Sequence, residues 1–329
     1  MNPRLLADYM PIRVHWEQGY PLVDWCHFGE ARFVESFFDQ TIEKRLRHPF
    51  ALLFRPQTSL DDLVELQAID PGVPPTGFIF HMSRCGSTLL SQMLAALPRN
   101  IVISEASPID GVLHANWRNP NITDEQRICW LRGLLSAYAR PRQGEQHFFV
   151  KFDSWHTLEL SLIQRAFPGV PWIFLYREPV QVLVSHQRQR GPQVVQGMLP
   201  PQWLGLDPAT LADMTLDEYT ACVLAKICQG ALHYRNADAR WVNYQQLPAV
   251  LWEELAAHFR LAYSAAEIAA IQQVLPFNAK NPGLYFVGDT KDKEHQATPE
   301  LRQLAEQWLQ PVYTALEEQR HTEGPPISP

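Results

Sequence analysis

The chain has 329 residues, of which 46% are hydrophobic and 19% are charged, so it is long enough to bury a sizeable core. The formal net charge of −7 argues against broad nucleic-acid binding, which needs a basic surface, but leaves room for a small anionic ligand. The five cysteines lack the spacing of a zinc site or a disulfide framework, the N-terminus lacks the pattern of a signal peptide and no apolar run is long enough for a membrane span, so we expect a cytoplasmic protein.

The first 76 residues are rich in aromatic side chains. The spacing of Phe33, Phe37 and Ile42 predicts a helix over about residues 30–47, and Ser59 followed by Asp62 predicts the start of another. The segment DPGVPPTG then interrupts the pattern at residues 70–77. We therefore expect an N-terminal accessory segment, residues 1–76, packed on a core domain of residues 77–329.

Beyond residue 77, short apolar runs alternate with helical segments. Strands are predicted at residues 77–82, 100–104, 147–153, 171–177 and 239–244. Helices are predicted over residues 87–97, up to residue 167, behind residue 177, over 215–235 and 248–259, and in a C-terminal run kinked by Pro311. The pattern predicts an α/β fold, a three-layer sandwich with a central parallel sheet. Ligands of such sheets bind beyond the carboxyl ends of the strands.

The segment HMSRCGSTLL follows the first of these strands and opens a helix. Gly86 permits a sharp turn, and Ser87 and Thr88 stand in the first helical turn, where hydroxyl and backbone N–H groups converge on an anion. Arg84 adds a positive charge. The loop is therefore interpreted as an anion cradle; the alternative is an ordinary strand–turn–helix junction in which the two hydroxyls cap the helix.

The same loop lacks two features of a nucleoside-triphosphate loop. His81 stands where that loop has its first glycine, and Ser87 stands where it has lysine. A donor with less phosphate charge than ATP therefore suits the loop better. A cysteine phosphatase is excluded because Ser91 occupies the place of the required arginine, so Cys85 is interpreted as a small loop residue.

A second loop, LYREPVQVLVSH, follows the fourth predicted strand. Arg177 lies at the strand end and can make a bidentate contact to a phosphate, and Ser185 lies eight residues later on the following helix. The alternative is a solvated arginine and a buried helical serine.

The two loops together resemble the PAPS-dependent sulfotransferases of the P-loop sulfotransferase superfamily, in its bacterial type. SRCGSTLL is similar to their 5′-phosphosulfate loop, and Arg177 with Ser185 is similar to their 3′-phosphate motif. The resemblance covers roughly residues 77–260, with Cys85 in place of the usual serine and Leu89 in place of a common tryptophan. It implies 3′-phosphoadenosine-5′-phosphosulfate as co-substrate. The loop residues that it assigns to the donor are Ser83, Arg84, Cys85, Gly86, Ser87 and Thr88.

Two further segments are similar to the same family. VNYQQL places Tyr244 at a tyrosine position of the donor pocket, although Gln245 and Gln246 replace an acidic pair. FVGDTKDK is similar to the basic segment that closes over the 3′-phosphate, which makes Lys291 or Lys293 a candidate contact.

Sulfuryl transfer needs an in-line acceptor, a base for its proton and positive charge at the leaving oxygen. Lys151, at the end of HFFVKFD, resembles the family's lysine and is assigned to the leaving group. Glu105 resembles the base of one bacterial branch, while Asp153 and His156 remain alternative bases, and either carboxylate could instead cap a helix. No metal-ligand cluster is apparent, so we expect no metal cofactor.

The proline-rich stretch of residues 189–215 is expected to lie over the acceptor pocket. Its few charges favour a small-molecule or carbohydrate acceptor of mixed polarity. Two other functions stay open, a P-loop kinase-like phosphotransferase and a non-catalytic nucleotide-binding protein of the same fold. The acceptor and the oligomeric state are not determined by the sequence.

Overall fold

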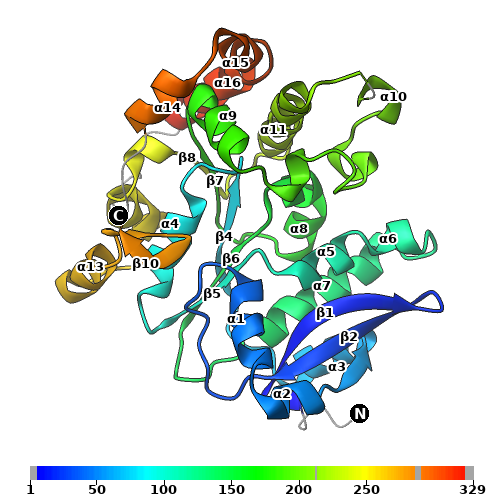
Figure 1. The fold of residues 1–329 in the computed structure, drawn as a ribbon. Coiled ribbons are helices and arrows are strands. Elements are labelled where there is room, and N and C mark those ends of the chain that lie inside the picture. Colours follow the sequence, from blue (N-terminus) through cyan, green and yellow to red (C-terminus); the bar gives the residue numbers. More distant parts are fainter. Residues whose placement is uncertain (1–5, 212, 286–289, 323–329) are drawn as a thin grey trace. The chain divides into compact units, whose positions relative to one another are not determined.

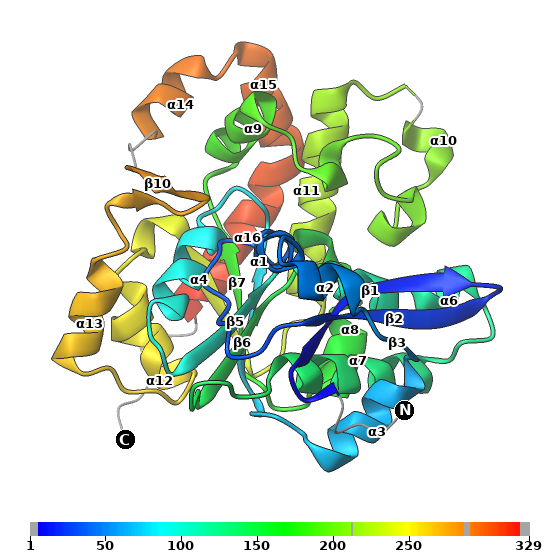
Figure 2. The same ribbon diagram turned by 60° about the horizontal axis from the view of Figure 1, so that its bottom comes forward.

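The computed structural model describes residues 6–211, 213–285 and 290–322 (Figures 1 and 2). Five strands form one sheet in the order β5-β6-β4-β7-β8, flanked by helices. The strands are β4 (Pro75–His81), β5 (Asn100–Ser104), β6 (His147–Lys151), β7 (Trp172–Tyr176) and β8 (Ala239–Asn243). The prediction of an α/β fold with a central parallel sheet is confirmed, and every predicted strand of the sheet is present.

The chain divides into two compact units, each built from several segments. Unit 1 comprises Met1–Phe78, Ser91–Lys151 and Ser161–Val170, and unit 2 comprises Ile79–Leu90, Phe152–Leu160 and Pro171–Pro329. Within unit 1, β5 pairs with β6 in parallel register, and within unit 2, β7 does so with β8. The accessory role of residues 1–76 stays a prediction.

The N-terminal part of unit 1 contains a small antiparallel sheet that the sequence analysis missed. Its order is β1-β2-β3, with β1 at Tyr9–Glu17, β2 at Tyr20–His27 and β3 at Gln57–Ser59. Three helices accompany it: α1 (Phe38–Leu46), α2 (Pro49–Leu53) and α3 (Asp61–Ile69). The predicted helix over residues 30–47 is therefore correct only from residue 38 to residue 46. The expected Ser59–Asp62 box is present, since the Asp62 N–H donates to Ser59 Oγ at 3.2 Å.

Two helices of unit 1 pack closely on this N-terminal part. The helices that complete the unit are α5 (Ser107–Leu113), α6 (Ala115–Arg118), α7 (Asp124–Tyr138) and most of α8 (Leu160–Ala166). A Cβ atom added to Gly111 of α5 would lie 2.6 Å from Cβ of Val14 in β1. One added to Gly133 of α7 would lie 2.8 Å from the backbone of Leu63 in α3. Because glycine has no Cβ atom, α5 can lie close to β1 and α7 can lie close to α3.

Unit 2 holds the remaining helices and a two-stranded hairpin. The hairpin strands are β9 (Phe277–Asn278) and β10 (Asn281–Tyr285). The helices are α9 (Pro179–Arg188), α10 (Pro208–Leu211), α11 (Leu216–His233), α12 (Ala256–His258), α13 (Ala265–Gln272), α14 (Thr290–Gln296), α15 (Pro299–Leu304) and α16 (Gln310–Thr322). Helix α4 (Ser87–Ala95) belongs to unit 2 as far as Leu90 and to unit 1 from Ser91. Short 3₁₀ segments cover Ser154–Glu159, Pro192–Val194, Pro201–Leu204 and Tyr244–Gln246, and π-helical turns cover Leu251–Leu255 and Ala305–Leu309.

The C-terminal helical run is interrupted where the sequence analysis placed a kink. A π-helical turn, Ala305–Leu309, separates α15 from α16, and Pro311 stands at the start of α16. Because proline has no N–H to donate into the preceding turn, a local change of helix type is the expected response. Of the helices in the described residues, none has the length and apolarity needed to cross a membrane.

Candidate functional site

The loop between β4 and α4, in unit 2, has an unusual backbone. Ser83 (φ 76°), Arg84 (φ 53°) and Gly86 (φ 93°) all adopt left-handed conformations, which side-chain-bearing residues rarely do. Left-handed residues in such a loop can turn backbone N–H groups toward one side, which is a feature of anion-binding concavities. Helix α4 begins directly behind it at Ser87. A loop of this backbone in front of a helix start agrees with the predicted cradle, and anion binding there, including by Ser83, Ser87 and Thr88, stays a prediction.

His81, which the sequence analysis used only to exclude a triphosphate loop, supports the cradle. The Ser83 N–H donates to Nδ1 of His81 at 3.0 Å, and Nε2 of the same ring lies 3.1 Å from the carbonyl oxygen of Phe152. Nδ1 must accept, so the ring proton lies on Nε2 and donates to that carbonyl. The imidazole therefore fastens the start of the loop.

Cys85 and Arg84 are both held by protein groups. Cys85 is fully buried, and its thiol donates to the Leu175 carbonyl at 3.0 Å, as suits a small loop residue. The Arg84 guanidinium donates to the carbonyl oxygen of Gln189, the C-cap residue of α9, at 2.5 Å. A cation at a helix C-terminus is electrostatically favourable. Contact of either side chain with the donor stays a prediction.

Arg177, directly after β7, is 5% exposed and held in a defined orientation. Its Nε donates to Oε1 of Gln181 at 2.7 Å, one turn along α9. Its guanidinium carbon lies 4.0 Å from the centroid of the Tyr244 ring, in cation–π geometry. Arg177 is therefore preorganised, because one edge is fixed by Gln181 and one face by Tyr244.

Tyr244, directly after β8, also touches the cradle. A Cβ atom added to Gly86 would lie 2.7 Å from Cδ2 of Tyr244 and 3.0 Å from Cδ1 of Leu247. Glycine at position 86 is thus required twice, for its positive φ and for the close approach of the ring. Three residues predicted separately, Gly86, Arg177 and Tyr244, come together around one aromatic ring.

A pocket of about 310 Å³ opens beside this ring. Its volume lies at the lower end of the range of small-molecule sites. Leu89, at the position where the resembling family has tryptophan, is one of its walls. The lining residues are Leu89, Gln181, Tyr244, Gln245, Leu247, Pro248 and Leu275. The pocket lining is therefore mainly apolar and includes the side-chain amides of Gln181 and Gln245.

Helix α14 packs on α9, the helix that carries Ser185. Gln181 Nε2 donates to Oε1 of Glu294 at 3.4 Å, and Lys293 beside it is 3% exposed. A role for Lys293 at the 3′-phosphate stays a prediction. The side chain of Lys291 lies outside the described residues.

His186, the residue after Ser185, is buried without a hydrogen-bond partner for either ring nitrogen in the part of the chain that the structure describes. Burial, together with the smaller effect of the positive charges of Arg84, Arg190 and Lys280, lowers the pKa of His186 to about 3. The ring is therefore neutral in the folded protein and protonated at mildly acidic pH in the unfolded chain.

We expect the free energy of unfolding of the His186→Leu variant to fall less at acidic pH than that of the wild-type protein. The unfolded chain binds the extra proton as the pH falls below about 6.5, so the native protein loses stability from there down to the folded pKa of about 3. At pH 4.5 the variant should gain about 2.5 kcal/mol relative to wild type beyond any difference at pH 7. Urea unfolding at both pH values measures this, with the exposed His295→Leu as control. Equal pH dependence in His186→Leu and wild type would contradict the expectation.

In unit 1, Lys151 and Glu105 form an ion pair. Lys151 ends β6 and is fully buried, whereas the Glu105 side chain keeps 23% of its surface exposed. The Glu105 N–H donates to the Lys151 carbonyl at 2.8 Å, and Glu105 adopts a left-handed φ of 53°. Backbone strain at a non-glycine residue is often found at functional sites. The Lys151 ammonium also lies 5.2 Å from the centroid of the Phe37 ring.

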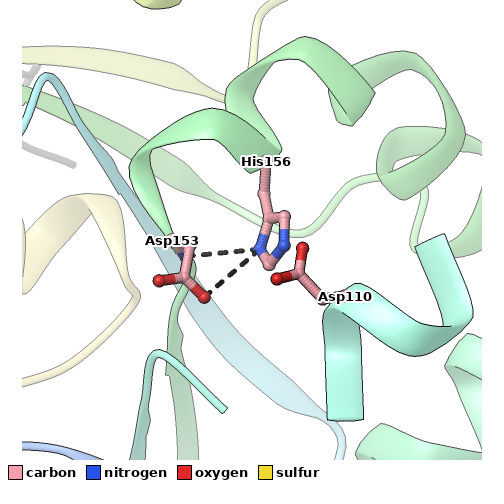
Figure 3. A group of neighbouring side chains, drawn as sticks. All are labelled: Asp110, Asp153 and His156. Carbon is pink, nitrogen blue, oxygen red and sulfur yellow. Dashed lines mark hydrogen bonds and ion pairs between the residues drawn. The ribbon is translucent and has the colours of Figure 1, made fainter. Parts of the chain in front are cut away.

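Asp153 and His156, in unit 2, are engaged with each other (Figure 3). The Asp153 N–H donates to Nδ1 of His156 at 3.3 Å, and the Asp153 carboxylate caps the 3₁₀ segment Ser154–Glu159. His156 is fully buried and Asp153 is 8% exposed. Both side chains thus take part in a local cap, and the identity of the base among Glu105, Asp153 and His156 stays a prediction. Asp110, also drawn in Figure 3, lies in unit 1 with Nδ1 of His114 at 3.3 Å from its carboxylate.

No protein-family model matches the sequence, and no curated protein matches it. Among solved structures, the chain is similar to the sulfotransferase domain from the curacin biosynthetic pathway (16% identity over 72% of this chain and 98% of that chain, TM-score 0.44). It is similar to sulfotransferase STF9 from Mycobacterium avium (12%, 76% and 80%, 0.44) and to the sulfotransferase domain of the Synechococcus PCC 7002 olefin synthase (20%, 76% and 96%, 0.40). At identities this low, the similarity concerns the fold alone.

Proposed function

We propose that the chain is a sulfotransferase that moves a sulfuryl group from 3′-phosphoadenosine-5′-phosphosulfate to a hydroxyl or amine of an acceptor. The observation that carries the proposal is the convergence of Gly86, Arg177 and Tyr244 in unit 2. Gly86 belongs to a cradle for one anionic group, and Arg177 offers a fixed guanidinium for a second. A nucleotide with phosphate groups at both ends of its ribose needs this pair.

The pocket beside Tyr244 supplies a place for the base of the nucleotide. Its apolar walls, Leu89 and Leu275, suit a planar purine, and Gln181 and Gln245 offer amide groups for ring nitrogens. Because Gln181 also holds Arg177, base recognition and 3′-phosphate recognition share one residue.

The Lys151–Glu105 pair supplies the reacting groups of the proposal. The acceptor oxygen or nitrogen forms a bond to sulfur as the bond between sulfur and the bridging phosphate oxygen breaks, and the bisphosphate leaves with that electron pair. Lys151 stabilises the negative charge on the leaving oxygen, and Glu105 accepts the proton of the acceptor. Glu105 suits this role because its carboxylate remains accessible.

Each strand of the parallel sheet is followed by a residue of the proposal, as expected for an open α/β sheet. The pairs are β4 with Gly86, β5 with Glu105, β6 with Lys151 at its last position, β7 with Arg177 and β8 with Tyr244. Candidate residues at strand ends are expected of a ligand site in a sheet of this kind.

Calorimetric titration with 3′,5′-diphosphoadenosine and with ATP/Mg²⁺ tests the donor. We expect the bisphosphate to bind at least tenfold more tightly than 5′-AMP, because only the bisphosphate engages Arg177. Tight binding of ATP/Mg²⁺ without a response to the bisphosphate would support a phosphotransferase instead. Tight binding of the bisphosphate without transfer of radiolabelled sulfate to any cell metabolite would support a non-catalytic nucleotide-binding protein.

A further inference from the structure

The start of helix α1 reaches the Lys151–Glu105 pair of unit 1. Phe37, the N-cap residue, places its ring 5.2 Å from the Lys151 ammonium. Asp39, two residues later, accepts a hydrogen bond at 3.3 Å from the hydroxyl of Ser107, which itself lies two residues after Glu105. The sequence analysis assigned no functional residue to this segment.

The intervening residue, Phe38, fixes the segment in place. Its side chain is 1% exposed and lies between the rings of Phe33 and Tyr138, with centroid distances of 5.8 and 5.4 Å. Phe37, by contrast, is half-buried, and Asp39 is reached by solvent. With Phe38 anchored in the core, its two neighbours are held at the reacting pair while remaining accessible to a ligand.

The charges at this place do not balance. Asp39 and Glu105 contribute two carboxylates, and Lys151 contributes one ammonium group, which leaves one negative charge. Partial burial raises the pKa of Asp39, and the negative charge of Glu105 raises it further, although the hydrogen bond from Ser107 opposes the change. Glu105 has Lys151 as its counter-ion. A cationic ligand that binds Asp39 would therefore neutralise the remaining negative charge.

A buried hydroxyl near Asp39 points to the same conclusion. Tyr138 is fully buried, and among the described residues its hydroxyl has no hydrogen-bond partner. The Tyr138 ring lies 5.4 Å from the ring of Phe38, the neighbour of Asp39 in the chain. Burial raises the pKa of Tyr138, and the charge of Asp39 adds to the rise. A buried hydroxyl without a partner is costly, so a bound polar group is the expected remedy.

We propose that Phe37 and Asp39 form the acceptor-binding wall of the site and that the acceptor carries a cationic amino group, which Asp39 binds. This inference rests on the proposed sulfotransferase function and deepens it. The Phe37 ring covers the Lys151 ammonium on one side, and its free edge supplies an apolar contact for the acceptor skeleton. The hydrogen bond from Ser107 holds the Asp39 carboxylate beside the segment that carries Glu105, the group that accepts the proton.

The test begins with a metabolite extract separated by ion exchange into cationic, neutral and anionic pools before any enzyme is added. Each pool is incubated with ³⁵S-labelled donor and the full-length protein. We expect label to enter the cationic pool. The Asp39→Asn variant should lower incorporation there by about tenfold, as loss of one ion pair at a binding site implies. With the purified acceptor, the loss should appear mainly in KM and not in kcat.

Matched variants separate binding from folding. Glu43→Gln removes the same charge from the same helix, at a side chain that is 70% exposed and paired with Arg47, and should leave incorporation unchanged. Affinity for 3′,5′-diphosphoadenosine should be equal in wild type, Asp39→Asn and Glu43→Gln. Label confined to the neutral or anionic pool overturns this inference alone. Label in no pool, with the bisphosphate still bound, overturns the proposed transfer and this inference with it.

Discussion

Replacing Arg177 with lysine should lower the affinity for 3′,5′-diphosphoadenosine by about 30- to 100-fold while affinity for 5′-AMP changes little. Lysine keeps the positive charge but cannot donate two parallel hydrogen bonds to a phosphate. Its single ammonium group also cannot replace two contacts of the planar guanidinium at once, the hydrogen bond to Gln181 at 2.7 Å and the stacking on the Tyr244 ring. The expected loss corresponds to about 2–3 kcal/mol, measured by titration calorimetry with both nucleotides.

Arg188→Lys is the matched control for this experiment. Arg188 lies on the same helix, is exposed, and donates to Oε1 of Gln296 at 2.9 Å. It should retain wild-type discrimination between the two nucleotides. If Arg177→Lys also retains that discrimination, the 3′-phosphate contact has been assigned to the wrong residue.

Replacing Glu105 with glutamine should lower kcat by about 10²- to 10⁴-fold, the range for loss of a general base. The amide has nearly the same shape but cannot accept the proton of the acceptor. Under the proposed function, binding of 3′,5′-diphosphoadenosine should change little, because most of the residues proposed for the donor are those of the cradle, Arg177 and Tyr244. Steady-state sulfate transfer and calorimetry on one preparation measure both quantities.

Asp153→Asn and His156→Gln distinguish the alternative bases. Both residues serve a local 3₁₀ cap, so these variants should lower the melting temperature more than they lower kcat. An Asp153→Asn variant that folds normally and loses kcat, beside an active Glu105→Gln variant, would move the base from Glu105 to Asp153. The exposed Glu125→Gln, at a side chain 75% exposed, serves as the neutral control.

The central sheet could be predicted from the sequence because its strands are apolar on both faces and bounded by turns. The predicted strand at residues 100–104 coincides with β5, and the run at 239–244 exceeds β8 by one residue. A short continuous apolar run of this kind is readily assigned to a strand, because a buried parallel strand needs such a run. The helix predicted over residues 215–235 likewise becomes α11, opened by a capping box at Thr215.

The N-terminal region was harder to predict for identifiable reasons. The β1–β2 hairpin turns at Gln18 (φ 49°) and Gly19 (φ 84°), a pair with the backbone of a hairpin turn but without the usual Asn-Gly signal. Phe33 and Phe37 fall at helical spacing, yet they precede the helix. Phe33 stacks on Phe28 at 4.6 Å, so aromatic packing and not helical periodicity places it.

For the candidate site, the sequence predicted residue types at strand ends but not their mutual contacts. Gly86, Arg177 and Tyr244 were each predicted separately, whereas their convergence depends on the order of the strands in the sheet. The roles of His81 and Phe37 could not be predicted, because a histidine inside a strand and a phenylalanine in an aromatic segment carry no local signal. Both depend on tertiary contacts, to Ser83 and to Lys151.

The contact of one aromatic ring with both Gly86 and Arg177 has a thermodynamic consequence. The Tyr244 ring lies against both Gly86 and the Arg177 guanidinium. A substitution at either position that displaces the ring therefore changes the surroundings of the other. Free-energy changes from substitutions at positions 86 and 177 should therefore fail to add, since residues with a shared partner are energetically coupled. Under the proposed function, binding of the 5′-phosphosulfate end of the donor and binding of its 3′-phosphate end would therefore be energetically coupled.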